Sequence, residues 1–144
     1  MQEDLVALET AKLAKEKGFD IPTIQYYTIK GYCTESEGYM TERYAESNWN
    51  NGMGSYPTRT EEVSCSAPTQ SLLAKWLREM HKINVESNYL PNIQKYRCLF
   101  VPMTKSISIK EKYSLKSKYY GIENFDTYEE ALEVGLQEAL KLIK

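Results

Sequence analysis

The side chains best suited to catalysis in this sequence are one histidine and one cysteine. His81 is the only histidine, so a Ser-His-Asp or Cys-His arrangement would have to use it. It follows an apolar-periodic segment and precedes Lys82, and because a helix C-terminus favours cations, a capping role explains it. Cys65 lies between two serines ahead of an expected helix, a position that can lower a thiol pKa. Cys98 stands in an apolar run and is expected to be a buried strand thiol.

Carboxylates gather in one short stretch, the acidic cluster of residues 35–46. Its members are Glu35, Glu37, Glu42 and Glu46. Such residues can act as acid–base pairs or bind cations, but their spacing matches no known ligand loop, and a solvated face explains them more simply. One histidine and three cysteines without a Cys-x-x-Cys pair make no zinc motif. We therefore predict no catalytic residue, no cofactor and no metal, and keep an enzyme using Cys65 or the acidic cluster as an alternative.

Tyrosine is unusually frequent, with 12 residues among 144. Its ring buries area while its hydroxyl stays polar, which suits binding surfaces and ordinary strands alike. Residues 34–62 form a polar stretch, rich in turn residues and poor in aliphatic ones, that carries Tyr39, Tyr44, Trp49 and Tyr56. Because such loops carry function more often than core, we predict that these four aromatics bind the ligand or partner. We also expect that a short Gly/Ser linker can replace residues 36–56 without loss of the fold.

Charge is nearly balanced, with 18 basic and 20 acidic residues and a net charge of -2, which argues mildly against nucleic acid as the partner. The layout is uneven, because basic residues gather after residue 92. Cations interleaved with tyrosines suit single strands, so residues 92–120 form an alternative nucleic-acid surface. Its candidate contacts are Lys95, Arg97, Lys110, Lys112, Lys116 and Lys118.

The elements that must position these residues follow from periodicity and capping signals. Helices are expected over residues 3–17, 66–81 and 127–143, the first ending at Gly18 and the last opening with a capping box. The apolar stripes of the second and third helices include Met80 and Tyr128, which are therefore expected on buried faces. Alternating residues predict strands at 23–30, 83–89 and 96–101, with 105–109 as a further short candidate. A turn at Pro91 and Asn92 makes the strands at 83–89 and 96–101 an expected antiparallel pair. We therefore expect one α+β domain, residues 1–144, with three helices packed on a small, mostly antiparallel sheet and a tyrosine-rich excursion at 34–62.

Two features bear on location. The longest strongly apolar run, Cys98 to Met103, is too short to cross a bilayer, and the opening Met-Gln-Glu-Asp has neither the basic nor the apolar region of a secretory signal. An odd number of cysteines without a paired motif is typical of a reducing compartment. We therefore expect a cytoplasmic protein without a membrane partner, and the sequence leaves its oligomeric state open.

Residues 13–31 resemble the opening of MerR-type winged-helix regulators. The shared pattern is Leu-Ala-x-x-x-Gly, then Thr-Ile-Arg-Tyr-Tyr, then Gly, at the same spacing. Gln25 stands where the pattern has an arginine that would contact phosphate, and Thr28 replaces an acidic residue. The wing that follows in that family has no counterpart, so this resemblance implies a DNA-binding opening without its phosphate contact.

Three longer blocks occur in the order 8–19, 66–85 and 125–143. They read LETAKLAKEKGF, SAPTQSLLAKWLREMHKINV and FDTYEEALEVGLQEALKLI. Together they resemble a family of small uncharacterised proteins encoded by phages and prophages of anaerobic gut bacteria. That family has no assigned activity, so the resemblance implies an accessory gene of a mobile element and no catalytic residues. We expect a phage-related accessory protein that binds a host protein or a small nucleotide-like ligand.

Overall fold

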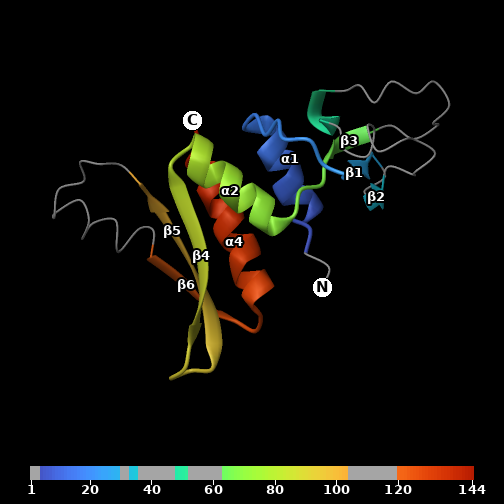
Figure 1. The fold of residues 1–144 in the computed structure, drawn as a ribbon. Helices are drawn as coiled ribbons and strands as arrows, with labels where there is room; N and C mark the ends of the chain where they lie inside the picture. The colour runs from blue at the N-terminus through green and yellow to red at the C-terminus, as the bar shows by residue number, and fades with distance from the viewer. Residues whose placement is uncertain (1–3, 30–32, 36–47, 52–62, 104–119) are drawn as a thin grey trace. The chain divides into compact units, whose positions relative to one another are not determined.

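The computed structural model describes residues 4–29, 33–35, 48–51, 63–103 and 120–144 (Figure 1). It has an α+β fold, with three helices and two three-stranded antiparallel sheets in the described residues. The chain divides into two compact units. The N-terminal unit is Leu5–Thr69, and the C-terminal unit joins Gln70–Lys144 to Met1–Asp4. The expected class is confirmed, but each unit has its own sheet in place of the one sheet expected. The single domain stays a prediction.

Within the part of the N-terminal unit that the structure describes, the chain forms one α-helix, one 3-10 helix and one sheet. In chain order the elements are α1 (Leu8–Glu16), β1 (Gln25–Thr28), β2 (Cys33–Glu35), η2 (Trp49–Asn51) and β3 (Val63–Ser66). The strand order is β2-β1-β3, so β1 pairs on both sides, and Tyr26 and Tyr27 lie opposite Ser66 and Cys65. The small polar residues of β3 gave no strand signal in the sequence, where Ser66 was expected to open a helix.

Helix α1 begins later than the expected residue 3. Leu5 forms an isolated bridge with Thr69, and the Val6 N–H donates to the Pro68 carbonyl at 3.0 Å. These residues are therefore extended, and the helix starts only after Ala7, whose ψ is 157°. The alanine content of this segment favoured a longer helix, but pairing with residues 68 and 69 prevails over that local preference.

The end of α1 was predicted correctly. Gly18 has a φ of +85°, the left-handed conformation that glycine adopts without strain. The Phe19 N–H donates to the Ala14 carbonyl and the Gly18 N–H to the Lys15 carbonyl, both at 3.0 Å. This pair of bonds is the Schellman arrangement, which satisfies carbonyls at the helix end and turns the chain back. Phe19 is buried as a result.

The described residues of the C-terminal unit form two helices and the second sheet. The elements are α2 (Gln70–Met80), β4 (Ile83–Leu90), β5 (Lys95–Pro102), β6 (Tyr120–Phe125) and α4 (Tyr128–Lys141). The strand order is β4-β5-β6, and the predicted hairpin around Pro91 and Asn92 is confirmed as an antiparallel pair. Helix α4 packs on β4 and β5, and α2 packs on β4 and α4, so both helices cover the same face of the sheet (Figure 1). Strand β6 was not predicted, and the short strand expected at 105–109 lies outside the described residues.

The core of the C-terminal unit lies between these helices and the sheet. Its fully buried side chains include Leu73, Leu77, Cys98, Leu136 and Leu140. Two residues expected on the buried helix faces are exposed instead: Met80 at 65% and Tyr128 at 44%. Met80 is the last residue of α2 and Tyr128 is the first residue of α4. At these helix ends the apolar stripe still includes the residue, but no opposing element in the described residues covers it.

Candidate partner-binding surface

Trp49 is the one predicted binding aromatic that lies within the described residues. It is only 9% exposed, and its indole N–H donates to the Thr23 carbonyl at 2.7 Å. Its ring centroid is 4.4 Å from that of Tyr26. The expectation that Trp49 lacks neighbours to bury it is therefore wrong. Tyr39, Tyr44 and Tyr56 lie outside the described residues, so their binding role stays a prediction.

Asn50, in the 3-10 helix η2, forms hydrogen bonds to two other parts of the N-terminal unit. Its side-chain amide donates to the Phe19 carbonyl at 2.7 Å, and its Oδ1 accepts from the Ser66 N–H at 2.9 Å. The residue therefore links the end of α1 to β3. Because η2 supplies this link and the buried Trp49, a Gly/Ser linker over residues 36–56 would remove part of the interior. Trp49 and Asn50 therefore argue against tolerance at η2, and the outcome of the replacement stays a prediction.

The candidate nucleophile Cys65 is buried in β3 with no exposed surface. Burial raises the pKa of the Cys65 thiol above its ordinary value. The hydrogen bond to Ser64 and the charges of Lys15 and Lys12 act in the opposite direction and are smaller. The position therefore does not lower the pKa of the thiol as a helix N-terminus can, because Cys65 belongs to a covered strand. Cys98 is a buried free thiol in β5, as expected.

His81 also differs from its expected role as a cation at the end of α2. Its ring contacts the Trp76 ring edge-on, with centroids 4.4 Å apart. Burial lowers the pKa of His81 below its ordinary value, which favours the neutral imidazole. Burial at this position therefore acts against the cation expected at the end of α2.

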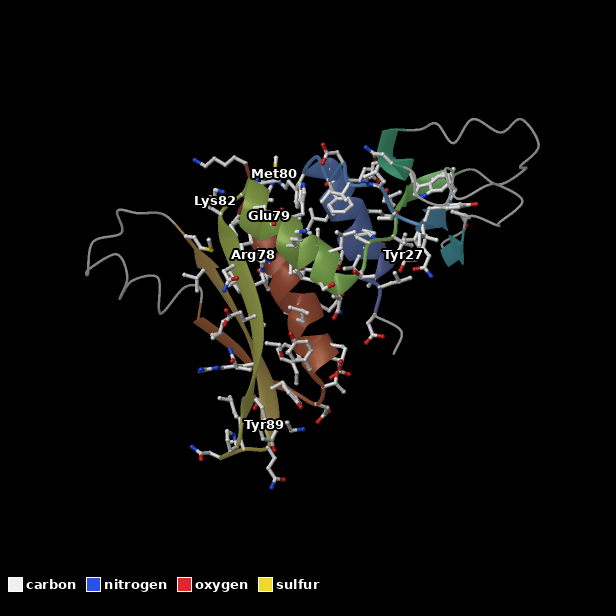
Figure 2. All side chains as sticks on the ribbon, viewed as in Figure 1. Tyr27, Arg78, Glu79, Met80, Lys82 and Tyr89 are labelled. Carbon is white, nitrogen blue, oxygen red and sulfur yellow. The ribbon has the colours of Figure 1, made fainter. Side chains whose placement is uncertain are left out.

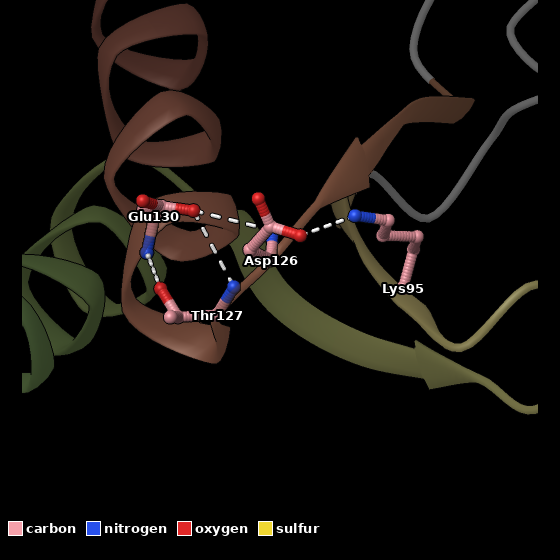
Figure 3. Close-up of polar contacts among 4 residues, drawn as sticks. All are labelled: Lys95, Asp126, Thr127 and Glu130. Atoms are coloured by element: carbon pink, nitrogen blue, oxygen red, sulfur yellow. Dashed lines mark hydrogen bonds and ion pairs between the residues drawn. The ribbon is translucent and has the colours of Figure 1, made fainter.

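The other chemical candidates fall mostly outside the described residues. Of the acidic cluster only Glu35 is included, as the last residue of β2. No group of three potential ligands is placed to hold a metal ion within the described part of the chain. In the basic stretch, Lys95 forms an ion pair with Asp126 (Figure 3), and Arg97 lies opposite Glu123 in the β5–β6 ladder. Lys110, Lys112, Lys116 and Lys118 are not described, so the nucleic-acid alternative stays a prediction.

The structure assembles a different group of aromatics, which we call the tyrosine cluster: Tyr89, Tyr96 and Tyr128. The rings of Tyr89 and Tyr96 have centroids 5.1 Å apart, and those of Tyr96 and Tyr128 are 6.4 Å apart and perpendicular. Tyr89 is 51% exposed and Tyr128 44% exposed, whereas Tyr96 is half-buried. Figure 2 shows Tyr89 towards the hairpin end of the β4–β5 ribbon, away from Met80 at the end of α2.

Strand register brings the first two rings of the cluster together. Tyr89 and Tyr96 are directly opposite each other in the β4–β5 ladder. Side chains alternate between the faces of a strand, so Tyr89 shares a face with the buried Ile83 and Val85. That face is covered by α4 along most of the hairpin, but α4 begins only at Tyr128. The rings near its first residue are therefore only partly covered.

The third ring is fixed by the capping box of α4 (Figure 3). The Thr127 hydroxyl accepts from the Glu130 N–H at 3.1 Å. The Glu130 carboxylate accepts from the backbone N–H groups of Asp126 and Thr127 at 3.2 and 3.4 Å. Asp126 in turn pairs with Lys95 on β5. These bonds place Tyr128 on a well-defined first turn beside the hairpin.

The surface beside the tyrosine cluster is acidic. From residue 120 to residue 133 the chain carries five acidic side chains and no lysine or arginine. Three of the five, Asp126, Glu129 and Glu130, are exposed around Tyr128. The cluster was not predicted, because the apolar periodicity of α4 assigns Tyr128 to a buried face. The available signal was the hairpin register, since a turn centred between residues 92 and 93 places Tyr89 opposite Tyr96.

Comparisons with protein-family models, with curated proteins and with solved structures find no match to this chain. None of the helices in the described ranges has the length and apolar character needed to cross a bilayer. The functional argument therefore depends on the surface itself: three contacting tyrosines on rigid elements, with carboxylates beside them.

Proposed function

We propose that this protein acts by binding another protein through the tyrosine cluster, and not by catalysis. The observation that carries the proposal is the contact series of Tyr89, Tyr96 and Tyr128, two of which are about half exposed. Tyrosine is enriched at interfaces because a large ring gives contact area at low entropic cost and the hydroxyl finds a polar partner. Exposed apolar patches on otherwise polar surfaces mark interaction sites.

The setting we propose is that of a cytoplasmic, phage-related accessory protein with a host protein as partner. The three sequence blocks at 8–19, 66–85 and 125–143 support the phage setting by their resemblance. The buried free thiols Cys65 and Cys98 are compatible with a reducing compartment. Burial of Cys65 disfavours the thiol version of an enzyme, because the thiolate and not the thiol is the nucleophile. The acidic side chains around Tyr128 disfavour a phosphate-rich partner at this surface.

Affinity purification from infected host cells tests the proposal with matched variants. Tyr89→Ala and Tyr128→Ala remove exposed rings of the cluster, and Met80→Ala removes a still more exposed apolar side chain at the other end of the C-terminal unit (Figure 2). We expect Met80→Ala to recover the same partner as the unmodified protein. Each tyrosine variant should lose most of it, because aromatic anchors at interfaces contribute roughly 2 kcal/mol or more.

Recovery of the partner by both tyrosine variants would contradict the proposal. It would move the binding site to Tyr39, Tyr44 or Tyr56, where the sequence analysis placed it. Trp49→Ala is not an informative variant for this purpose, because Trp49 is buried and its loss would disturb the N-terminal unit itself.

A further inference from the structure

The rings of the tyrosine cluster differ in orientation, which matters for what they can bind. Tyr96 and Tyr128 are perpendicular, and Tyr89 is tilted by 56° from Tyr96. The face of an aromatic ring carries negative charge and its edge positive charge. A cation within about 6 Å of a ring centroid is attracted to the face. Rings that differ in direction and lie this close can offer faces to one cation together.

The charges beside the rings also favour a cation. Asp126, Glu129 and Glu130 are exposed around Tyr128. Lys95 brings a positive charge to this end of the hairpin, but it is paired with Asp126. Glu129 and Glu130 therefore leave this end of the unit negative, which favours a cation and disfavours a carboxylate or phosphate.

A helix N-terminus normally attracts anions, so the first turn of α4 needs separate consideration. Three N–H groups at this end of the helix already have partners within the chain. The Thr127 hydroxyl bonds the Glu130 N–H, and the Glu130 carboxylate bonds the N–H groups of Asp126 and Thr127. The chain's own carboxylates at the first turn thus compensate the positive end of the helix dipole. What an approaching partner meets is the excess negative charge.

We infer that the tyrosine cluster recognises a lysine or arginine side chain in a basic segment of the partner protein. This inference rests on the proposed function and names the chemistry of its partner. The cationic group lies against the ring faces of the cluster, whose exposed members are Tyr89 and Tyr128, and Glu129 supplies the charge beside it. Aromatic rings and carboxylates together select such a group over neutral and acidic segments, since an acidic segment would meet repulsion at this surface.

Binding of simple labelled peptides to the full chain tests the inference directly. A fluorescent peptide of alternating lysine and serine should bind, and one of alternating glutamate and serine should not. Binding should weaken as salt is raised, because exposed charges are screened beyond about 10 Å at 0.1 M ionic strength. Equal binding of the two peptides would overturn the inference.

Ring variants separate attraction to an aromatic face from loss of apolar area. Tyr89→Phe and Tyr128→Phe keep the face, whereas Tyr89→Leu and Tyr128→Leu keep bulk without it. We expect each leucine variant to bind the lysine peptide about two- to fivefold more weakly, and each phenylalanine variant to bind nearly as the unmodified protein does. Glu129→Gln should also weaken binding, and Met80→Ala should not. Unchanged affinity in both leucine variants, with unchanged melting curves, would overturn the inference.

Competition with the purified partner distinguishes this inference from the proposed function. If the partner depends on Tyr89 and Tyr128 but excess lysine peptide fails to displace it, the cationic inference fails and the proposed function stands. If the partner does not depend on the tyrosines, both fail. A variant with Lys110, Lys112, Lys116 and Lys118 changed to serine tests whether the chain's own basic segment occupies the cluster. Tighter peptide binding by that variant would overturn recognition of a partner's basic segment, and equal binding would support it.

Discussion

The two units are stabilised by different kinds of interaction. The C-terminal unit buries aliphatic side chains from helices and strands against one another, with Leu77 and Leu136 fully covered. The N-terminal unit also buries apolar side chains such as Phe19, but several of its side chains bond to distant backbone atoms. Tyr27 donates to the Val6 carbonyl at 2.7 Å, and Asn50 bonds to residues 19 and 66. In the C-terminal unit Gln70 makes one such bond, to the Glu129 carbonyl at 3.1 Å. Apolar packing tolerates many residue types of similar volume. Each of these hydrogen bonds, in contrast, requires a particular donor or acceptor atom at a particular position.

The largest expected effects come from the two tryptophans, of which each unit has one. Trp76 is 3% exposed and Trp49 is 9% exposed. Trp76→Ala and Trp49→Ala should each cost about 3–5 kcal/mol, because a large buried ring leaves a cavity. Urea denaturation followed by circular dichroism measures both, and the remaining tryptophan reports on the other unit by fluorescence. An unchanged urea midpoint for Trp49→Ala would show that residues 48–51 lie at the surface and do not stabilise the N-terminal unit.

Asn50→Ala tests whether polar bonds stabilise the N-terminal unit. It leaves the Phe19 carbonyl and the Ser66 N–H without the side chain that now bonds both. An unsatisfied buried polar group costs about 1–3 kcal/mol, so a loss in that range is expected in the same urea experiment. Asn50→Asp is the matched control for size. It still accepts from Ser66 but places a carboxylate against the Phe19 carbonyl, so it should not restore stability. Full stability of either variant would contradict the role given to this side chain.

Gly135→Ala tests how closely apolar groups pack in the C-terminal unit. A Cβ added to Gly135 would lie 2.9 Å from Cγ1 of Val85 and 3.0 Å from Cβ of Cys98. Overpacking costs about 1–3 kcal/mol, and alanine returns up to about 1 kcal/mol of helix propensity. The net effect on thermal unfolding should be destabilising. Adding Val85→Ala should recover part of the loss attributable to Gly135→Ala, and strictly additive effects would show that the contact is not the cause.

The same contrast explains which parts of the fold the sequence could predict. Leu73, Leu77 and Leu136 repeat at helical spacing, and Ile83 and Val85 alternate, so the helices and the β4–β5 hairpin of the C-terminal unit were recognisable. The bonds of Trp49, Asn50 and Tyr27 join residues 16 to 31 positions apart. Such bonds leave no periodic signal, which is why residues 48–51 were interpreted as part of a binding loop. Strand β3 was missed for the same reason, since Val-Ser-Cys-Ser lacks strand propensity.

The sequence predicted tyrosines at a binding surface, but at residues 34–62 and not at the tyrosine cluster. Excess tyrosine indicated a binding surface, and the structure describes exposed tyrosines in contact. Tyr128 was assigned to the buried face because it continues the apolar stripe of α4. Periodicity states which face of a helix is apolar but not how far the opposing element extends. The ring of Tyr128 is therefore exposed because the apolar stripe of α4 extends beyond the element that packs against it.

Gly18→Ala should have a smaller effect than the preceding changes. Nothing lies within 4 Å of an added Cβ at this position, so steric contact is not the issue. The φ of +85° remains, and a left-handed conformation costs an L-residue about 1–2 kcal/mol. Gly18→Asn should cost less, because asparagine tolerates this region. Thermal melting of the two variants measures which of them is less stable. Equal stability of Gly18→Ala and the unmodified protein would show that α1 ends differently.

The smallest expected effects are pH-dependent and opposite in sign for the two units. Burial lowers the pKa of His81 from its ordinary 6.5. The unfolded chain then takes up the proton first, so the C-terminal unit loses stability as the pH falls below about 6.5 towards the lowered value. Burial raises the pKa of Cys65 from its ordinary 9.0. The N-terminal unit should therefore lose stability as the pH rises past about 9 towards the raised value.

Matched variants isolate these two contributions. His81→Gln should flatten the acid side of the stability profile, and Cys65→Ala should flatten the alkaline side, when each is compared with the unmodified protein by urea denaturation across the pH range. The comparison depends on the slopes and not on absolute stability, since Cys65→Ala also leaves a small cavity. A steeper acid slope after His81→Gln would mean that the imidazole is stabilised as a cation. In that case the attraction of the α2 terminus would outweigh packing against Trp76, and the original interpretation of His81 would be restored.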